Sequence, residues 1–587
     1  MLDVHSEPYA PSGNISASGV GNSLGTPTMD RLRVFIREAV QNSWDARLKG
    51  QTPRFAVTLR KLEEAQLAFL RETILRDPGT DVEFAQAKDG LLDSTPWILE
   101  VHDSGTKGLG GPTRADVISS SGVNDFVDFV RNVGSPRDVE YGGGTYGYGK
   151  SAAYILSTMG MILVHTRTMS DADETERFIG ARLGPSHDNS GTRHTGRHWW
   201  GRNVDGVIEP AVDDDAAVIA SSLGLGPRPK GRTGTTVAIV APEMDEKTPE
   251  QITATIAECL MLYFWPKMLG NENRSMEFAL TGPDGVFPLP DPEEFPPVSL
   301  AAKAMRKIDA EDESVITVES KRPSKKLGKL AIVKGRRLDR LKWDTGDESS
   351  IIPDRLSHVA LMRPAELVVK YLQGPRLPSE FSEHGGVFVV ERDLESVFAH
   401  AEPPAHDDWI PDKLPKSERV FVNVALSRIR DALNDFASPA DHTFYGNGEG
   451  DDHELRSLST ELGKLIGSLT NHEVSKGGRM TRKGTSRTSK PGAVHAGFGI
   501  VQDRRCALFD VGTGSGLKSM TVFVRIEGSE IPSNAAGERP EVVAWRAAAS
   551  SDWQTGSPDL GVTGEAASSF QIAVSLPDDC AIGLEVK

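Results

Sequence analysis

A short stretch near the N-terminus places a carboxylate, an amide and a second carboxylate at helical spacing. In the sequence REAVQNSWDA, Glu38, Asn42 and Asp45 lie four and three residues apart, so a helix presents them on one face. An amide oxygen can bind Mg²⁺, and a carboxylate one turn away can orient or deprotonate a water molecule. The pattern therefore indicates magnesium-dependent phosphate chemistry, with the solvated polar face of an amphipathic helix as the alternative.

Asp103 begins the segment DSGTKG, directly after a stretch that alternates as a strand, Trp97–His102. A carboxylate at the end of a strand can accept a hydrogen bond from an exocyclic amine, and Gly105 lets the backbone approach a planar base closely. The alternative is an ordinary strand-to-loop turn, in which Asp-Ser-Gly is common. Only in combination with other motifs does the segment favour a site for a nucleotide base.

A glycine-rich run, GGGTYGYGKS at residues 142–151, opens a predicted helix. Free backbone N–H groups and the positive end of the helix dipole would suit a polyphosphate there. Read literally, Gly144 through Ser151 also matches the P-loop pattern G-x-x-x-x-G-K-[ST]. A P-loop must follow a buried strand, however, and residues 133–141 are polar, so a P-loop NTPase is the weaker alternative.

The elements that would position these motifs are an amphipathic helix and a series of strands. Apolar or small residues recur at helical spacing from Leu32 to Ala46, which predicts a buried stripe beside the polar face. A further helix is predicted to begin after Thr248, where Thr-Pro-Glu-Gln combines an N-cap, a proline at N1 and Gln251 at N3. Strands are predicted at Met161–Thr168, Phe178–Leu183, Thr235–Val240, Val315–Val318, Lys329–Val333, Val359–Met362, Leu367–Tyr371 and Val387–Val390.

Shifts in composition divide the chain, whose predicted fold class is α+β. The predicted parts are a flexible N-terminal arm (1–27), an α/β unit (28–245), a second α/β unit (246–440), a helical segment (441–475), a basic linker (476–491) and a small β-sandwich (492–587). A dense aromatic cluster, formed by His194, His198, Trp199 and Trp200, is expected to pack in a loop, because no third ligand for a metal is evident.

The composition excludes several classes of protein. The chain has 587 residues and a formal net charge of −17. This charge argues against a surface that is positively charged throughout and binds nucleic acid. Local basic runs, Lys321–Lys342 and Lys476–Lys490, remain candidate patches for DNA. Three widely spaced cysteines indicate neither a disulfide framework nor a zinc cluster, and they fit a reducing cytoplasm. No signal segment and no run of about 18 apolar residues is present, so no membrane partner is expected.

These three motifs and a fourth, Gly234-Thr235 at the start of the predicted strand Thr235–Val240, resemble in this order those of the GHKL or Bergerat-fold ATPases. This family includes gyrase-type topoisomerases, MutL, ninety-kilodalton heat-shock chaperones, histidine kinases and MORC proteins. The resemblance covers residues 28–245 and is nearest to MORC-like prokaryotic ATP-binding proteins. The matched motifs are E-x-x-x-N-[SA]-x-D-A (Glu38–Ala46), D-x-G-x-G (Asp103 and Gly105), the lid motif G-x-x-G-x-G (Gly144, Gly147 and Gly149) and G-T-x-[VI] (Gly234 and Thr235). Lys107 departs from the second motif, which has a glycine at that position.

The resemblance implies a role for each matched polar residue. Glu38 would act as the general base for the attacking water, and Asn42 would be the Mg²⁺ ligand. Asp45 would hold the site in place rather than touch the nucleotide. Asp103 would bind the adenine amine, supported through a water by Thr235.

The resemblance also implies that backbone groups bind the rest of the nucleotide. Gly105 would let the base approach, and Gly144, Gly147 and Gly149 would offer their N–H groups to the phosphates. Lys150 follows the lid directly and would reach a phosphate. Its alternative role is to place charge at the start of a helix.

For the whole chain, the resemblance implies a Bergerat α/β sandwich that binds ATP and Mg²⁺, a transducer-like second domain and slow, lid-gated hydrolysis. ATP would close a homodimer, and hydrolysis would reset it. A role in antiphage defence or in a DNA-associated system is implied, with the C-terminal β-domain as the surface for a protein partner. The alternative is a nucleotide-binding interaction scaffold with negligible hydrolysis. The additional motifs of histidine kinases, topoisomerases and MutL-type endonucleases are not recognised.

Overall fold

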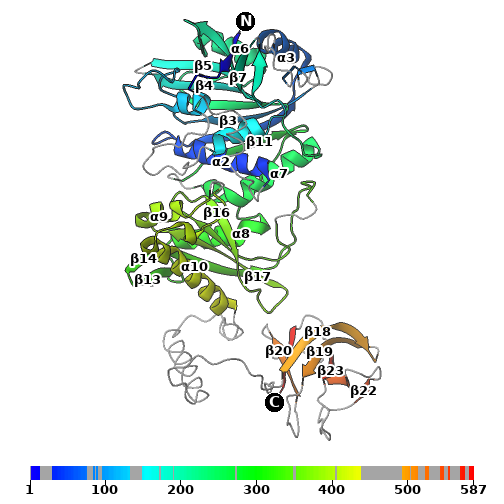
Figure 1. Ribbon diagram of the computed structural model, residues 1–587. Coiled ribbons are helices and arrows are strands. Elements are labelled where there is room, and N and C mark those ends of the chain that lie inside the picture. Colours follow the sequence, from blue (N-terminus) through cyan, green and yellow to red (C-terminus); the bar gives the residue numbers. More distant parts are fainter. Residues whose placement is uncertain are drawn as a thin grey trace. The chain divides into compact units, whose positions relative to one another are not determined.

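The computed structural model forms two compact units, Met1–Asn447 and Gly448–Lys587, each of which is described by itself. The structure describes residues 2–12, 30–75, 84–85, 88–89, 96–132, 148–170, 173–189, 191–270, 274–347, 352–403, 406–437, 492–502, 504–512, 522–527, 542–547, 553–555, 569–575 and 581–586. Over these residues the protein is a mixed α/β structure with several sheets (Figure 1). No helix in these ranges is long and apolar enough to cross a membrane.

The first unit contains a large sheet, in which twelve strands of the described residues join. Nine of them follow the order β1-β7-β5-β4-β10-β3-β2-β11-β12, and the pair β2 and β11 is parallel. These strands are β1 (Asp3–Pro8), β2 (Arg54–Lys61), β3 (Trp97–Ser104), β4 (Met161–Ser170), β5 (Asp173–Leu183), β7 (Thr192–Val204), β10 (Gly234–Val240), β11 (Glu277–Gly282) and β12 (Gly285–Val286). Short strands pair at the margin: β6 (His187–Asn189), β8 (Val207–Glu209) and β9 (Ala211–Val212).

Helices cover both faces of this sheet (Figure 1). One face packs against α2 (Arg31–Asp45), α5 (Tyr148–Ile155) and α7 (Pro249–Tyr263), and the other against α3 (Glu64–Phe69) and α6 (Asp213–Ser222). Successive side chains of the central strands point to opposite faces of the sheet and so contribute to two hydrophobic cores, one on each face. In β10, Ile239 belongs to the core under α2, α5 and α7, and Ala238 and Val240 belong to the core under α3 and α6. The predicted start of the helix after Thr248 is confirmed, including its capping box with Gln251.

The first residues of the chain form a strand instead of a flexible arm. β1 lies at the edge of the sheet, antiparallel to β7, with Val4 opposite Trp200 and Ser6 opposite His198. Ser6 Oγ lies 2.7 Å from His198 Nδ1. The prediction of a flexible arm is therefore wrong for Asp3–Pro8, because pairing with a distant strand outweighs local composition. Residues 13–29 lie outside the described residues.

The cluster of histidine and tryptophan residues lies in β7, so the prediction that it packs in a loop is also wrong. Gly196 and Gly201 interrupt the apolar pattern of this strand, and therefore no strand was expected there. The His187 ring stacks on those of His194 and His198, at centroid distances of 5.2 and 5.4 Å. Across the part of the chain that the structure describes, no group of three or more His, Cys, Asp or Glu residues is arranged to hold a metal.

The first sheet continues beyond residue 245, where the sequence predicts a boundary. α7 packs on α2, and β11 then adds to the edge of β2, with Phe278 opposite Phe55 and Leu280 opposite Val57. The apolar residues Ile252, Ile256 and Leu260 of α7 belong to the same core as Phe35 and Ile36 of α2 (among others). The structural boundary of the N-terminal sheet therefore lies after Val286.

A second sheet follows in the same unit, with strand order β13-β14-β17-β15-β16. Its strands are β13 (Ile316–Lys321), β14 (Ser324–Arg336), β15 (Ser357–Met362), β16 (Val368–Gln373) and β17 (Ser382–Val390). One face packs against α8 (Pro296–Asp309), and the other against α9 (Glu395–His400) and α10 (Lys416–Ala437). The five strands predicted in this unit are confirmed, with boundaries that differ by a few residues.

The C-terminal unit consists of strands over its described residues. A five-stranded sheet has the order β18-β19-β23-β21-β22, and a two-stranded sheet pairs β20 with β24. The strands are β18 (Gly492–Val501), β19 (Arg504–Gly512), β20 (Val522–Glu527), β21 (Val542–Ala547), β22 (Gln554–Thr555), β23 (Ser569–Ser575) and β24 (Ala581–Val586). The predicted helical segment 441–475 and basic linker 476–491 lie outside the described residues.

A buried lysine follows α7, in the 3₁₀ turn Trp265–Met268. Lys267 is 1% exposed, its Nζ lies 3.5 Å from the centre of the Trp44 ring, and no hydrogen-bond acceptor meets this nitrogen among the described residues. Burial lowers the pKa of Lys267 to about 7, despite the opposing attraction of Glu366. Burial of this lysine therefore lowers the free energy of unfolding at pH values where the unfolded chain carries it in the charged form.

We expect Lys267→Met to raise the free energy of unfolding by about 1–3 kcal/mol near pH 7. Since the pKa is about 7 in the folded protein and 10.5 in an ordinary lysine, the unfolded chain holds more protons between these values. The wild-type protein should thus become less stable as the pH falls from about 10 to 7. Urea denaturation at both pH values tests this: the variant should lose that part of the pH dependence. Equal dependence in both proteins would contradict the prediction.

Candidate functional site

The helix that carries the predicted metal and base residues is α2. Its first turn is capped by Asp30, whose carboxylate accepts a hydrogen bond from Leu32 N at 2.7 Å. The apolar stripe, which includes Phe35, Ile36 and Val40, is buried against the sheet and α7. The polar residues Glu38 and Asn42 are half-buried at the margin of this stripe, so the predicted polar face beside the apolar stripe is confirmed.

Glu38 and Asn42 meet on this face of α2. Asn42 Nδ2 donates to Glu38 Oε1 at 3.3 Å, and both side chains are half-buried. With its NH₂ group directed to Glu38, the amide leaves Oδ1 for another ligand. Asp45, one turn further on, is exposed to solvent.

A cavity of about 200 Å³ lies beside this helix, over the ends of strands β3 and β10. Asn42, Asp45, Asp103 and Thr235 line it, and these are four of the residues that the sequence predicts for the site. The walls are largely apolar and come from α2, β3, the loop after β3, the helical turn Val127–Arg131, α5 and β10. Their apolar residues are Phe35, Ala39, Val101, Leu109, Phe129, Ala153 and Val237. Apolar walls with a few convergent polar groups are typical of small-molecule sites.

Asp103 is held at the end of β3 by three donors. Its Oδ1 accepts from Thr235 N at 2.8 Å and from Thr106 Oγ1 at 2.6 Å, and its Oδ2 accepts from Ser43 Oγ at 3.0 Å. A carboxylate oxygen can accept more than one hydrogen bond, so Oδ2 can still receive an amine from a ligand in the cavity. The fixed orientation favours recognition of one donor in one place.

The loop after Asp103 turns on two glycine residues with left-handed backbone. Gly105 has φ +72° and Gly108 has φ +68°. A Cβ atom on Gly108 would lie 2.2 Å from the carbonyl oxygen of Arg167, so no other residue fits there without a shift of the backbone. Lys107 stands between them where the family motif has glycine; it is exposed and lines the cavity, as does Gly108.

Thr235 belongs to the polar base of the cavity, and buried Thr166 lies next to it. Their hydroxyl oxygens lie 3.0 Å apart, and Thr166 Oγ1 accepts from Leu109 N at 3.0 Å. Behind this pair, buried Arg228 donates to the carbonyl oxygen of Asp103 at 3.1 Å. Burial lowers the pKa of Arg228 to about 10, which still leaves it charged at neutral pH. Burial and the Arg228 charge together lower the pKa of His102 to about 3, so this ring is neutral.

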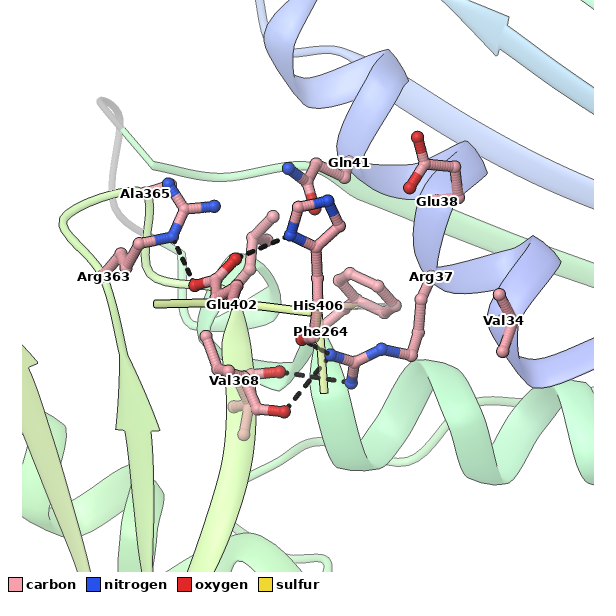
Figure 2. A pocket seen from close by; sticks show the side chains of 12 residues that line it. Val34, Arg37, Glu38, Gln41, Phe264, Arg363, Ala365, Val368, Glu402 and His406 are labelled. Carbon is pink, nitrogen blue, oxygen red and sulfur yellow. Dashed lines mark hydrogen bonds and ion pairs between the residues drawn. The ribbon is translucent and has the colours of Figure 1, made fainter. Parts of the chain in front are cut away.

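Glu38 lies on the side of α2 that faces the second sheet. It does not line the large cavity but a smaller pocket, together with Gln41, Arg363 and His406 (Figure 2). The hydrogen bond to Asn42 connects it to the cavity, because Asn42 lines the cavity. The structure therefore places Glu38 next to the predicted metal ligand, and not inside the space that the base and sugar of a nucleotide would occupy.

The glycine-rich lid is only partly within the described residues. Gly144 and Gly147 lie outside them. Gly149 and Lys150 fall in the first turn of α5, which begins at Tyr148, and the side chain of Lys150 is outside the described part. The prediction that this run opens a helix is confirmed for α5.

The donor set around Asn42 suits a magnesium ion. Mg²⁺ usually takes one or two oxygens from the protein and fills its other positions with phosphate oxygens and water. The Asn42 amide offers one such oxygen at the wall of the cavity, with the Glu38 carboxylate beside it. A bound Mg²⁺ would neutralise the charge of the phosphate groups.

Several residues of the site were not predicted. Ser43 falls within the predicted buried stripe Leu32–Ala46, although it also contacts Asp103. Thr106 contacts Asp103 from three residues further along the chain and was not singled out. Thr166 and Arg228 carried no signal, because their contacts join distant segments. For Ser43 a signal existed, because the residue after the asparagine is a fixed small position in the family motif. Comparison of the chain with models of known protein families and with curated proteins finds no significant match.

Proposed function

We propose that the protein binds Mg·ATP in the cavity between α2 and strands β3 and β10, and hydrolyses it slowly as a conformational switch. The observation that carries the proposal is the position of Asp103, held at a strand end among apolar walls. A planar adenine fits such walls, and its exocyclic amine would meet Asp103 Oδ2. Asn42 lines the same cavity and would hold the metal.

The arrangement of elements supports a GHKL-type architecture. α2, α5 and α7 pack on one face of a mostly antiparallel sheet. The described residues of the sequence motifs belong to this layer or to the strand ends below it: Glu38–Ala46, Asp103, Gly105, Gly149, Gly234 and Thr235. We propose that residues 30–286 form a Bergerat α/β sandwich, that the second sheet is the transducer-like domain, and that the C-terminal strands are a β-sandwich.

The proposed reaction transfers the terminal phosphoryl group to water. The water oxygen forms a bond to the terminal phosphorus, while the bond from this phosphorus to the bridging oxygen breaks and ADP leaves with the electron pair. A water proton passes to Glu38, which later releases it to solvent. Asn42, as a metal ligand, and the N–H groups near Gly149 would position the phosphate groups.

A nucleotide-binding scaffold with negligible hydrolysis remains the second candidate. The observation that favours it is the orientation of Glu38, which lines the smaller pocket and not the cavity. A P-loop NTPase has less support, since α5 packs on β4 and β10, which are antiparallel to each other, whereas P-loops follow strands of parallel sheets.

Turnover and mass in solution test the proposal together. Full-length protein with Mg·ATP should release phosphate slowly, and a non-hydrolysable ATP analogue should double its mass by closing a homodimer. Addition of duplex DNA to the same assays tests the candidate DNA partner. Binding of ATP without release of phosphate would favour the scaffold. If mass and turnover respond to none of these additions and no ATP binds, the proposal is wrong.

The biological setting is proposed from the resemblance to MORC-like proteins alone. The protein would act in antiphage defence or in a DNA-associated system, and a protein partner would bind the C-terminal strands. DNA would bind Lys321–Lys342, which covers the end of β13 and all of β14, or Lys476–Lys490, which lies outside the described residues.

A further inference from the structure

The smaller pocket beside Glu38 has a volume of about 20 Å³, enough for a single water molecule. Glu38 and Gln41 of α2 line one side of it (Figure 2). Arg363, Glu402 and His406 line the other side, and these three follow β15 and α9 in the unit of the second sheet. A pocket of this size, with several polar side chains in a partly apolar wall, is suited to hold one ordered water.

Three charged or titratable side chains are buried together on the second-sheet side of this pocket. Glu402 Oε1 accepts from Arg363 Nε at 2.7 Å, and Glu402 Oε2 lies 2.7 Å from His406 Nδ1. The side chains are 8% exposed for Arg363, 1% for Glu402 and 10% for His406. Such a buried group contributes little net stability, because the cost of desolvation offsets the attraction. Stability alone therefore does not account for this buried group.

The geometry fixes the tautomer of His406. Burial alone raises the pKa of Glu402, but Arg363 and His406 more than compensate and hold it below its ordinary value, so this residue is a carboxylate. A carboxylate at Nδ1 holds the proton on that nitrogen, so the neutral form of the ring has its lone pair on Nε2. Figure 2 shows the second ring nitrogen on the side of the ring that faces Gln41 and α2.

Arg37 fixes the segment of His406 to α2. Its guanidinium donates to the carbonyl oxygens of Val368 at 3.2 Å, Val369 at 3.2 Å and His406 at 2.6 Å. It also lies 4.0 Å from the centre of the Tyr263 ring. Arg37 is 7% exposed and directly precedes Glu38 in the chain. The backbone that carries the imidazole is therefore tied to the helical turn that carries the carboxylate.

We propose that His406 binds the attacking water together with Glu38, and that Glu402 and Arg363 are positioning residues that act through the imidazole. The inference rests on the proposed function, because it concerns the water of the hydrolytic step. The water donates one hydrogen to Glu38 and the other to His406 Nε2, which directs an oxygen lone pair to the phosphorus. As the phosphorus–oxygen bond forms, the proton passes to Glu38, and His406 takes none.

His406→Ala tests the inference in the full-length protein. We expect kcat for ATP to fall about 10- to 100-fold, because loss of one positioning contact leaves the water poorly aligned. The Kd of ATP should stay within about twofold, since the imidazole lies outside the nucleotide cavity. Free imidazole at millimolar concentration should restore part of the lost kcat by entering the vacated space. His406→Gln, which keeps an acceptor, should retain more activity than His406→Ala.

Two further variants separate positioning from folding. Glu402→Gln should lower kcat without changing the Kd of ATP, because an amide no longer fixes the tautomer of His406. His400→Ala is the matched control: it removes an exposed histidine from α9 in the same unit and should leave kcat unchanged. Melting temperatures measured for all variants identify any that fail to fold, and His406→Gln then serves in place of His406→Ala.

Each outcome bears on one of the two proposals. If the wild-type protein hydrolyses ATP and His406→Ala does so at the same kcat, the inference is wrong and the proposed function stands. Loss of kcat without rescue by imidazole, and with normal activity in Glu402→Gln, also overturns the inference, because it indicates a structural role. If the wild-type protein binds no ATP, the proposed function itself fails.

Discussion

Glu38→Ala is expected to lower the rate of phosphate release by about 100- to 10,000-fold, the usual contribution of a general base. The carboxylate is the group on α2 that can accept the proton of the attacking water, and it lies beside the predicted metal ligand Asn42. ATP binding should persist, because Glu38 does not line the nucleotide cavity. Single-turnover phosphate release and equilibrium binding of a fluorescent ATP analogue measure the two quantities separately.

Arg31→Ala provides the control for this experiment. Arg31 lies on the same helix, is exposed, and lines neither the cavity nor the smaller pocket. Its removal should leave the turnover unchanged. If Glu38→Ala turns over ATP at the wild-type rate, Glu38 is not the base; if wild type and variant both bind ATP without turnover, the scaffold function is correct.

Asp103→Asn is expected to weaken ATP binding about 100-fold, which corresponds to roughly 2.7 kcal/mol. The carboxylate accepts from Thr235 N and Thr106 Oγ1 on one oxygen and from Ser43 Oγ on the other. An amide has only one oxygen, so its NH₂ group must face a donor, either in the protein or on the adenine. Isothermal titration with ATP measures the loss of affinity.

Ser43→Ala is the matched variant for Asp103→Asn. It removes one donor from Asp103 Oδ2 and leaves the carboxylate and its two contacts with Oδ1 in place. We expect a loss of affinity of about fivefold or less, because two of the three donors still hold the carboxylate in place. The melting temperature of Asp103→Asn should be reported beside its affinity, since Thr235 N would lose a buried acceptor in one orientation of the amide. Wild-type affinity in Asp103→Asn would rule out adenine recognition by this residue.

Regular local patterns were read correctly from the sequence, and patterns that depend on distant partners were not. α2, β3 and α7 were predicted, because their apolar spacing and caps are contained within each segment. α8 was missed because Pro296 and Pro297 open it, and prolines suggest a break unless they are recognised as the first turn of a helix. β1 was missed because its pairing with β7 spans almost 200 residues.

The same distinction applies to the site. Asn42, Asp103 and Thr235 line one cavity as the order of the motifs predicts, since each motif fixes its residue at the edge of a predictable element. The side of the helix on which Glu38 lies could not be predicted in the same way. It depends on Arg37, whose three carbonyl partners come from β16 and the His406 segment, more than 300 residues further along the chain.

The parallel pairing of β11 with β2 sets a lower limit on the size of a usable fragment. A recombinant piece that stops at residue 245 would strip α7 from α2 and leave a row of unpaired peptide groups along β2. Such an edge recruits strands from other molecules, so the piece would tend to precipitate during expression. A piece that extends through β12 keeps α7 on α2 and β11 on β2. It is the shortest piece suited to crystallisation trials with nucleotide.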